Sequence, residues 1–340
     1  MKAAIFKGVG LPLAIEDVPI PDPGKDGVVF KVGRCGICSS DLHYTDGHSE
    51  TLSFKPGDML GHEVGGEVVA VGPEVTRFRP GDKIASMFMA GCGVCSFCIN
   101  GRPLFCANNR LMTGGYAEYA LGYENGLIRL PKSLSLADGA LIEPLAVALH
   151  GVRQCPIVPG SKVLVLGAGP IGLGAIFWAR KLGATQIAVS EINRKREDLA
   201  HLMGADHVIV AKESGRPLAD LARECLGGAP DIVLECVGIP GMLKEAIDCV
   251  QPTGTIGIIG YCMTPDSFVP AEAMLKEARM LFALTYNLGE YEHVARVLDG
   301  GSIEPRALIT DTISLSALPA RFEALRAPNS DIKVQVDPWQ

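Results

Sequence analysis

A glycine-rich turn, Gly167-Ala168-Gly169-Pro170-Ile171-Gly172, constrains the fold of this chain more than any other feature of the sequence. The apolar run before it predicts a buried strand at 162–166, and the segment after it predicts a helix at 170–182. In this context the first glycine makes the turn, the second lets the backbone approach a pyrophosphate, and the third allows helix and strand to pack closely. The helix N-terminus then stabilises the bound anion. The turn therefore predicts a dinucleotide-binding domain.

Strands and helices continue to alternate beyond this turn. We expect a helix at 194–203 and further strands at 186–190, 208–210, 232–235 and 255–259. Parallel strands need crossover connections, usually helices, so this alternation favours a parallel, doubly wound sheet.

An acidic residue, Glu191, ends the second predicted strand. A carboxylate at this place binds the ribose hydroxyls and repels a 2′-phosphate, so NAD is favoured over NADP. The basic run from Arg194 to Arg196 follows closely and favours the opposite preference. We include Arg196 among the predicted cofactor-binding residues.

The first 131 residues differ in texture from the rest. Short β-prone runs alternate there with glycine and proline turns, which is typical of an irregular all-β lobe. After about residue 284 the strand–helix alternation ends, and 332–336 predicts another strand of the first lobe. We therefore expect a dinucleotide-binding domain at 151–284, inserted into a catalytic domain formed by 1–150 and 285–340.

Charge and hydropathy exclude several partners. The formal net charge of −7 gives no attraction for nucleic acid or for an anionic membrane. No apolar stretch is long enough to span a bilayer, and the N-terminus lacks the pattern of a signal peptide. A cytoplasmic location is the expectation. Eleven cysteines in such a chain point to metal binding or burial rather than disulfides.

Four of these cysteines lie in one loop: Cys92, Cys95, Cys98 and Cys106. Four thiolates at this spacing can surround a zinc ion as a tetrahedron, and they leave no coordination position open. The loop thus predicts a structural zinc site. Disulfides and an iron–sulfur cluster are the alternatives, the first disfavoured in the cytosol and the second suggested by the two-residue gaps.

Two further motifs are candidates for a catalytic metal site. They run from Cys35 through Cys38 to His43 and from Gly61 to Gly66. A catalytic zinc needs about three protein ligands and one open position. Either motif alone is a weak signal, but both occur together with the four-cysteine loop.

At these motifs, and over nearly its whole length, the chain resembles the zinc-containing medium-chain alcohol dehydrogenases, in particular their sorbitol, threonine and polyol dehydrogenase branch. The matching motifs are Cys38-Ser39-Ser40-Asp41-Leu42-His43, Gly61-His62-Glu63-Val64-Gly65-Gly66 with Gly72, the four-cysteine loop, Glu143-Pro144 with the residues to His150, and the glycine-rich turn. The resemblance implies an α/β protein with a GroES-like catalytic domain and a Rossmann domain. It also implies one catalytic and one structural zinc per chain, and NAD as cofactor.

The resemblance makes Cys38 and His62 ligands of the catalytic zinc, and leaves Cys35 as a buried small residue. Classical alcohol dehydrogenases have a second cysteine where this chain has Glu143. In the polyol branch, Glu63 or Glu143 completes the zinc shell, directly or through water. A carboxylate in place of a thiolate makes the metal harder and more Lewis acidic.

The same resemblance assigns roles to the residues after Cys38. Asp41 orients His62, as metal-bound histidines nearly always require. Ser40 takes the proton of the alcohol and contacts the substrate, and His43 passes the proton to solvent. Tyr44 resembles a tyrosine of the substrate pocket.

A departure from the polyol enzymes bears on the substrate. They carry an Arg-Tyr pair whose arginine binds substrate oxygens, and this chain has Thr285-Tyr286 at the equivalent place. A hydroxyl cannot replace the multidentate, charged donor. We therefore expect a shorter or less polar secondary alcohol than a hexitol.

The predicted reaction is oxidation of a secondary alcohol, diol or polyol to a ketone, with hydride transfer to NAD. A zinc-free quinone or enone reductase should lack both ligand sets, and a non-catalytic NAD-binding protein should have lost Ser40, His43 or a ligand. The resemblance also implies a homo-oligomer, a tetramer in preference to a dimer. We expect no role for the remaining histidines, which are His48, His150, His201, His207 and His293.

Overall fold

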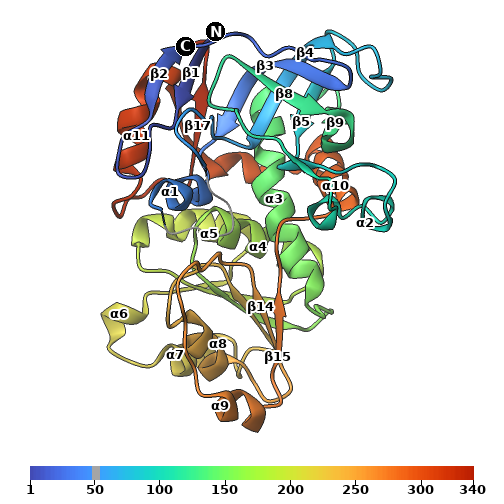
Figure 1. The fold of residues 1–340 in the computed structure, drawn as a ribbon. Coiled ribbons are helices and arrows are strands. Elements are labelled where there is room, and N and C mark those ends of the chain that lie inside the picture. Colours follow the sequence, from blue (N-terminus) through green and yellow to red (C-terminus); the bar gives the residue numbers. More distant parts are fainter. Residues whose placement is uncertain (48–53) are drawn as a thin grey trace. The chain divides into compact units, whose positions relative to one another are not determined.

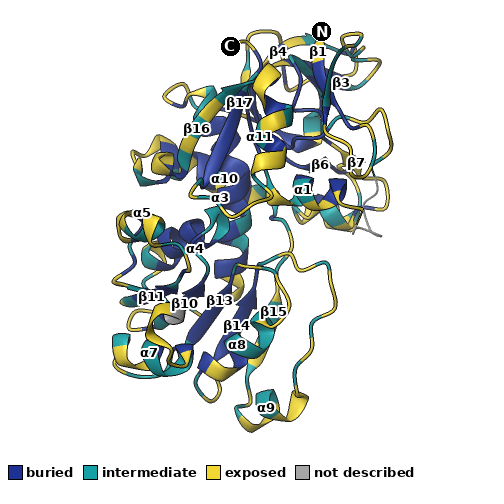
Figure 2. Cartoon of the chain, turned by 90° about the vertical axis from the view of Figure 1, so that its left-hand side faces the viewer, coloured by how far each residue is buried: buried dark blue, intermediate teal, exposed yellow. Residues whose placement is uncertain are grey.

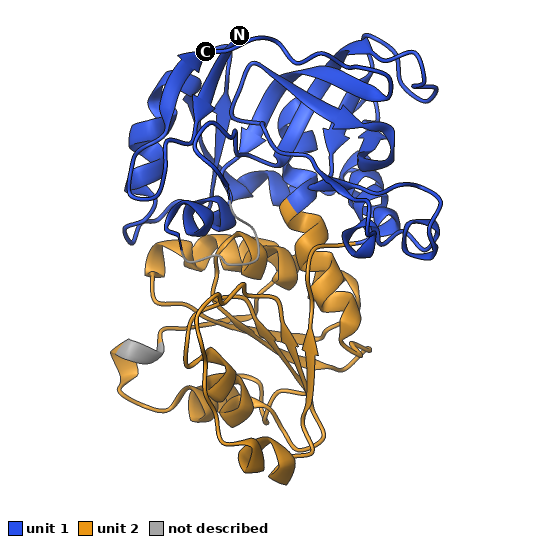
Figure 3. Cartoon of the chain, viewed as in Figure 1, with its two compact units in different colours: residues 1–143, 287–340 blue, residues 144–286 orange. Residues whose placement is uncertain are grey.

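The structure is a computed structural model that describes residues 1–47 and 54–340 (Figure 1). His48 lies outside the described residues. The chain forms two compact units, and the second is inserted into the sequence of the first (Figure 3). Unit 1 comprises Met1–Glu143 and Asn287–Gln340, and unit 2 comprises Pro144–Tyr286. The first boundary falls inside helix α3 (Leu136–Gln154).

In residues 1–47 and 54–340 we find no helix with both the length and the apolar character needed to cross a membrane.

Unit 2 is built on a parallel sheet, whose inner strands are buried (Figure 2). Among the described residues its strands lie in the order β12 (His207–Ile209), β11 (Gln186–Ser190), β10 (Lys162–Leu166), β13 (Ile232–Glu235), β14 (Thr255–Ile258) and β15 (Arg279–Phe282). All neighbouring pairs are parallel. The winding reverses between β10 and β13, so the predicted doubly wound sheet is confirmed.

The helices of unit 2 connect these strands. They are α4 (Pro170–Lys181), α5 (Glu197–Met203), α6 (Ala211–Ser214), α7 (Leu218–Cys225), α8 (Met242–Cys249) and α9 (Pro270–Leu275). The helix expected at 194–203 is instead a 3₁₀ turn, Arg194–Arg196, followed by α5. The sequence did not predict β15, because its four residues are only partly buried at the edge of the sheet.

Unit 1 contains a mixed, largely antiparallel sheet. Within the described residues its order is β16 (Ile309–Ser314), β17 (Lys333–Asp337), β3 (Gly27–Gly36), β4 (Glu63–Val71), β5 (Lys83–Ser86) and β9 (Leu127–Arg129), and β8 (Tyr119–Tyr123) also pairs with β3. Two smaller pairs are β1 (Lys2–Ile5) with β2 (Ala14–Asp17) and β6 (Met89–Ala90) with β7 (Arg110–Leu111). The helices are α1 (Ser39–Thr45), α2 (Ser96–Ile99), α10 (Leu288–Asp299) and α11 (Leu318–Ala324).

The core of unit 1 lies against β3 and fixes the end of this strand. Phe30, Tyr116 and Phe322 are among its fully buried side chains. β3 is flanked along its final residues by β4 on one side and β17 on the other, with Gly36 opposite both Glu63 and Gln335. The chain turns from this point into α1.

Candidate active site

The pairing of β3 with β4 brings the two candidate ligand motifs together. Gly36 lies opposite Glu63, Cys38 is the N-cap residue of α1 just beyond β3, and His62 directly precedes β4. Ligand atoms of Cys38, His62 and Glu63 all lie within 4.8 Å of one another. Zinc–ligand bonds of about 2.0–2.3 Å place the ligand atoms of one ion within about 4.6 Å of each other. The three side chains therefore fit a single metal ion after small adjustments.

His62 is buried and held by an acidic neighbour. Its Nδ1 lies 3.4 Å from Asp41 Oδ1, and the Tyr116 hydroxyl donates a hydrogen bond of 2.5 Å to Asp41 Oδ2. The Phe88 ring packs edge-on against the imidazole at 4.9 Å. Burial acts to lower the pKa of His62, but the charge of Asp41 outweighs it and holds this pKa well above its usual value. Because Nδ1 faces Asp41, Nε2 is the ring nitrogen available to a metal ion.

Glu63 is almost wholly buried, with its two oxygens in different surroundings. Oε1 accepts a 2.6 Å hydrogen bond from Lys333 Nζ, whereas Oε2 has no hydrogen-bond partner among the described residues. A Cβ on Gly36 would lie 1.9 Å from Oε2, so only glycine permits this approach. A buried carboxylate oxygen without a donor is costly unless a cation compensates it. Its place beside a thiol and an imidazole fits a metal ion.

Lys333 is a buried cation on β17. Its Nζ also donates to Ile37 O at 3.0 Å. Burial acts to lower the pKa of Lys333, but the charges of Glu63 and Cys38 outweigh this effect and raise the pKa above its ordinary value. Lys333 therefore stays charged and neutralises Glu63.

Glu143 and Cys35 are buried but lie outside this group of three ligands. Burial, and then the charges of Glu143 and Glu63, raise the pKa of Tyr291 well above its usual value, so both carboxylates act on the same surroundings. The Tyr291 hydroxyl donates to Ser86 O at 2.7 Å. Burial also raises the pKa of the Cys35 thiol, which disfavours the thiolate that a metal ligand needs.

Helix α1 carries the other predicted site residues of this unit. The Ser40 hydroxyl donates to Cys38 Sγ at 3.1 Å. His43 is exposed, whereas Tyr44 is buried and packs against Phe54 with ring centroids 5.5 Å apart. Ser40 is therefore directly beside the candidate ligand Cys38.

The four-cysteine loop also closes as predicted from its spacing. The Sγ atoms of Cys92, Cys95, Cys98 and Cys106 all lie within 4.8 Å of one another. Hydrogen bonds from the N–H groups of Val94 and Cys95 lower the pKa of Cys92 to about 6. Burial, and the neighbouring thiols, raise the pKa of Cys98 to about 12. A cation among the sulfurs would favour the thiolate at all four, which is the donor set of structural zinc.

In unit 2 the glycine-rich turn has the geometry that a dinucleotide-binding turn needs. Gly167 has a φ of +90°, which a side chain would disfavour. A Cβ on Gly172 would lie 1.9 Å from Gly167 O, so the third glycine is needed for close packing. Gly169 is the N-cap residue of α4, and Pro170 begins the helix, followed by Ile171.

Glu191, just after the end of β11, accepts hydrogen bonds from the glycine-rich turn and from the turn that follows β11. Its Oε1 accepts from Ile192 N and Asn193 N at 2.8 and 2.9 Å. Its Oε2 accepts from Ala168 N at 2.8 Å and faces Arg196 Nη1 at 3.4 Å. The carboxylate thus already has four donors, each near one of its lone pairs.

The sequence reasoning did not identify Lys333 or Tyr116. Lys333 had a usable signal, since it is a single cation between apolar residues in a predicted strand, and such a residue needs a buried partner. Tyr116 had none, because its contact with Asp41 depends on the tertiary fold.

Comparisons with known proteins agree with this geometry. Residues 24–132 match the family described as "Alcohol dehydrogenase GroES-like domain", and residues 170–300 match "Zinc-binding dehydrogenase". Sorbitol dehydrogenase of Bacillus subtilis (strain 168) is 31% identical over 345 residues, covering 99% of this chain and 97% of that protein. Sorbitol dehydrogenase of Ovis aries is 31% identical over 318 residues, covering 92% and 89%.

Solved structures give the same result. 2R,3R-butanediol dehydrogenase from Bacillus subtilis has a TM-score of 0.86 and 30% identity, with 99% of both chains covered. A putative zinc-binding dehydrogenase from Sinorhizobium meliloti 1021, bound to NADP, has a TM-score of 0.87 and 31% identity, also with 99% coverage of both. The chain belongs to the zinc-containing medium-chain alcohol and polyol dehydrogenase family, which confirms the resemblance. Its two parts are a GroES-like domain and a Rossmann-like domain, and its family relatives are oxidoreductases.

Proposed function

We propose that the protein is a zinc-dependent, NAD(H)-linked dehydrogenase that oxidises a secondary alcohol, diol or polyol to a ketone by hydride transfer. The observation that carries this proposal is the cluster of half-buried Cys38 with buried His62 and Glu63, in which Glu63 Oε2 has no donor in the described part of the chain. A zinc ion held by Cys38 and His62, with Glu63 or Glu143 completing its shell, would supply Lewis acidity toward the substrate hydroxyl. The four-cysteine loop would hold a second, structural zinc.

The chain's own residues handle the proton in this proposal. The Ser40 hydroxyl, 3.1 Å from Cys38 Sγ, contacts the substrate and takes the proton of the alcohol. His43 lies on the same helix, is exposed, and passes the proton to solvent. Asp41 keeps His62 in its orientation.

NAD(H) is the proposed cofactor, with its pyrophosphate at the turn from Gly167 to Gly172. Donors within the protein already occupy the Glu191 carboxylate. Glu191 therefore favours NAD by repelling a 2′-phosphate rather than by accepting hydrogen bonds from the ribose hydroxyls. Arg196 weakens this repulsion, and one structural relative is bound to NADP.

For the substrate we propose a small vicinal diol rather than a hexitol. The chain retains Tyr44 and has Thr285 where the polyol enzymes place an arginine, and a structural relative is a butanediol dehydrogenase. The sorbitol dehydrogenases among the relatives favour the longer polyol, so the choice needs measurement.

A homo-oligomer, a tetramer in preference to a dimer, is part of the proposal. β15 is an edge strand of the unit 2 sheet, and Phe282 on it and Leu284 after it are 72% and 53% exposed. An exposed apolar edge strand offers unpaired backbone groups that can pair with a second chain. A cytoplasmic location suits the eleven cysteines, which are all free in the structure.

The test is zinc analysis combined with NAD⁺ reduction in the presence of 2,3-butanediol. We expect two zinc ions per chain and diol-dependent NADH formation in the wild type. Cys38→Ser should lose one zinc ion and its activity, whereas Cys35→Ala should keep two zinc ions and full activity. Full activity without zinc would favour the zinc-free reductase, and NADH binding without turnover of any alcohol would favour the non-catalytic protein.

A further inference from the structure

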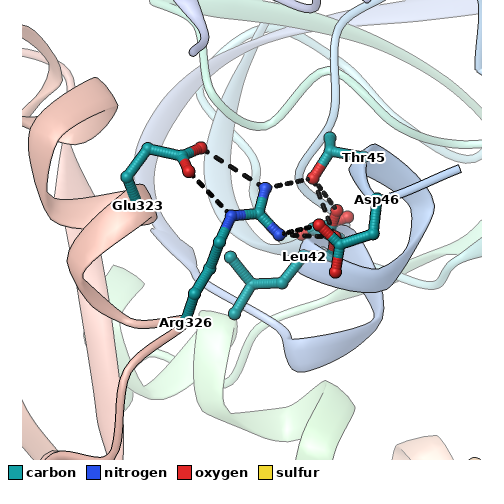
Figure 4. Close-up of polar contacts among 6 residues, drawn as sticks. Leu42, Thr45, Asp46, Glu323 and Arg326 are labelled. Atoms are coloured by element: carbon teal, nitrogen blue, oxygen red, sulfur yellow. Dashed lines mark hydrogen bonds and ion pairs between the residues drawn. The ribbon is translucent and has the colours of Figure 1, made fainter. Parts of the chain in front are cut away.

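A single arginine, Arg326, contacts the C-terminal end of helix α1 through several donors (Figure 4). Its Nη1 donates to Leu42 O at 3.0 Å and to the Asp46 carboxylate. Its Nη2 donates to Thr45 Oγ1 at 2.7 Å. Glu323 accepts from Nε at 2.8 Å and so fixes the plane of the guanidinium. The guanidinium therefore bonds to α11 through Nε and to α1 through Nη1 and Nη2.

One recipient, Leu42 O, is a backbone carbonyl of the kind that a helix end leaves without an N–H donor, and the other two are side-chain groups of the same helix end. A helix of seven residues has little stability of its own, and its last carbonyls have no N–H donors within the helix. The Thr45 hydroxyl lies 3.1 Å from Asp41 O and 2.8 Å from Leu42 O, and donates to these carbonyls. Its oxygen then remains as an acceptor for Arg326. The guanidinium thus adds donors for the Leu42 carbonyl, the Thr45 hydroxyl and the Asp46 carboxylate at this helix end.

A second residue that fixes α1 is the buried Asp41, which is connected to α11 through Tyr116. Tyr116 donates to Asp41, and its ring packs edge-on against Phe322 of α11 at 6.3 Å. The Arg326 guanidinium lies 5.5 Å from the centroid of the same Phe322 ring. Helix α1 is therefore held at Asp41 and at Thr45–Asp46, and both contacts involve α11 or the residues just after it. His43 and Tyr44 lie between these two points of α1.

We propose that Arg326 is a positioning residue for the reaction: it fixes the last turn of α1, and with it His43 and Tyr44, relative to Cys38 and His62. This inference rests on the proposed function for the roles of His43 and Tyr44. An ordinary surface ion pair contributes little. Arg326 differs from one, because its side chain is only 26% exposed and three of its contacts converge on one short helix.

The experiment compares Arg326→Met with Arg326→Lys and with a matched control, Arg321→Met. Arg321 lies on α11, is 28% exposed, and pairs with Asp311 and Asp331 rather than with α1. The measurements are hydrogen exchange of the amides at 39–46, zinc content, and kcat and KM with 2,3-butanediol and NAD⁺.

We expect Arg326→Met to retain both zinc ions and an unchanged KM for NAD⁺. Its kcat should fall by about 10- to 100-fold, the scale of small misplacements at active sites, and its α1 amides should exchange faster. Arg326→Lys should recover part of the loss, because an ammonium reaches only some of the acceptors. Arg321→Met should leave both kcat and α1 exchange as in the wild type. Asp46→Asn, a milder change on α1 itself, should give a smaller effect in the same direction.

Unchanged exchange of α1 in folded Arg326→Met, or in Asp46→Asn if the first variant does not fold, would overturn the proposal. So would faster exchange with wild-type kcat, because the contact would then be merely structural. A zinc-loaded wild type that oxidises no alcohol would instead overturn the proposed function, and the exchange comparison would still decide whether Arg326 holds α1.

Discussion

Lys333 Nζ lies 2.6 Å from Glu63 Oε1, and the two side chains are 3% and 1% exposed. The residues come from β17 and β4, which flank β3 on opposite sides, so the ion pair crosses the end of that strand. It is the contact that neutralises the carboxylate next to Cys38 and His62.

In zinc-free protein, replacement of Lys333 by methionine should leave Glu63 as an uncompensated buried charge. We expect Lys333→Met to lose about 3–5 kcal/mol of unfolding free energy, measured by urea denaturation. The double variant Lys333→Met/Glu63→Gln should recover much of this loss, since no charge is then left without a partner. Equal stability of the single variant and the wild type would show that another cation compensates Glu63.

Cys95→Ser should remove the structural zinc. Three thiolates and a hydroxyl bind the ion more weakly, and structural zinc contributes directly to folding free energy. We expect zinc content to fall from two ions to one per chain and Tm to fall with it. Cys262→Ser is the control, because Cys262 is exposed and outside both ligand groups. Loss of neither metal in Cys95→Ser would contradict the assignment of this loop.

Glu191→Ser should shift the cofactor preference toward NADP⁺. The substitution removes a negative charge and releases Arg196 to meet a 2′-phosphate. It also removes the acceptor of Ala168 N, so KM for NAD⁺ should rise as well. We expect the ratio of kcat/KM for NADP⁺ to that for NAD⁺ to increase about tenfold, or about 1.4 kcal/mol.

Arg196→Met should change that ratio in the opposite direction. Arg194→Met, which loses exposed pairs with Glu213 and Glu197, should leave it unchanged. A wild type that prefers NADP⁺ would assign the dominant role to Arg196.

Asp138 predicts a pH-dependent contribution to stability. Burial acts to raise its pKa, but hydrogen bonds from Arg306 at 2.7 Å and from Ser135 outweigh it and lower the pKa below 3.8. A carboxyl group with a lowered pKa stabilises the fold above its unfolded pKa, and this contribution is lost as pH falls through the folded value. Asp138→Asn should therefore cost about 1.5–3 kcal/mol at neutral pH and progressively less below about pH 4. Urea titrations of both proteins across this range test the sign, and a difference that is constant with pH would refute it.

The substrate prediction concerns relative specificity. We expect kcat/KM with NAD⁺ to be higher for 2,3-butanediol than for sorbitol, because Thr285 cannot supply the charged donor of an arginine. A simple secondary alcohol of similar size measures what the second hydroxyl contributes. A clear preference for sorbitol would show that other groups hold the longer polyol.

The strands of unit 2 were predictable because local signals define them. Buried parallel strands are continuous apolar runs, and 162–166, 186–190 and 232–235 match β10, β11 and β13 residue for residue. The irregular β lobe was less predictable, since the bounds of short strands such as β8 (Tyr119–Tyr123) depend on their partners. Its register follows from pairing with β3, which is a distant contact.

The candidate ligands were predictable for a different reason: their motifs occur together with the four-cysteine loop and resemble those of a known family. Asp41, which lies beside His62, was predicted in the same way, but two other supporting residues were not. Lys333 and Arg326 lie hundreds of residues from the groups they contact, and nothing in their local sequence indicates those partners. Long-range polar contacts of this kind depend on the assembled sheet.

The place of β17 in the chain has a consequence for biosynthesis. Residues 144–286 leave the ribosome as a contiguous unit, with all six strands of the described sheet, before β17 has been made. Until then Cys35 and Gly36 lack a partner strand on one side, and Glu63 lacks its buried counter-ion. We expect a nascent chain that stops short of Lys333 to form the parallel sheet of the second unit before the surroundings of Glu63 are complete. If zinc binds at the cluster of Cys38, His62 and Glu63 as proposed, the surroundings of that cluster are complete only after β17 has been made and has paired with β3.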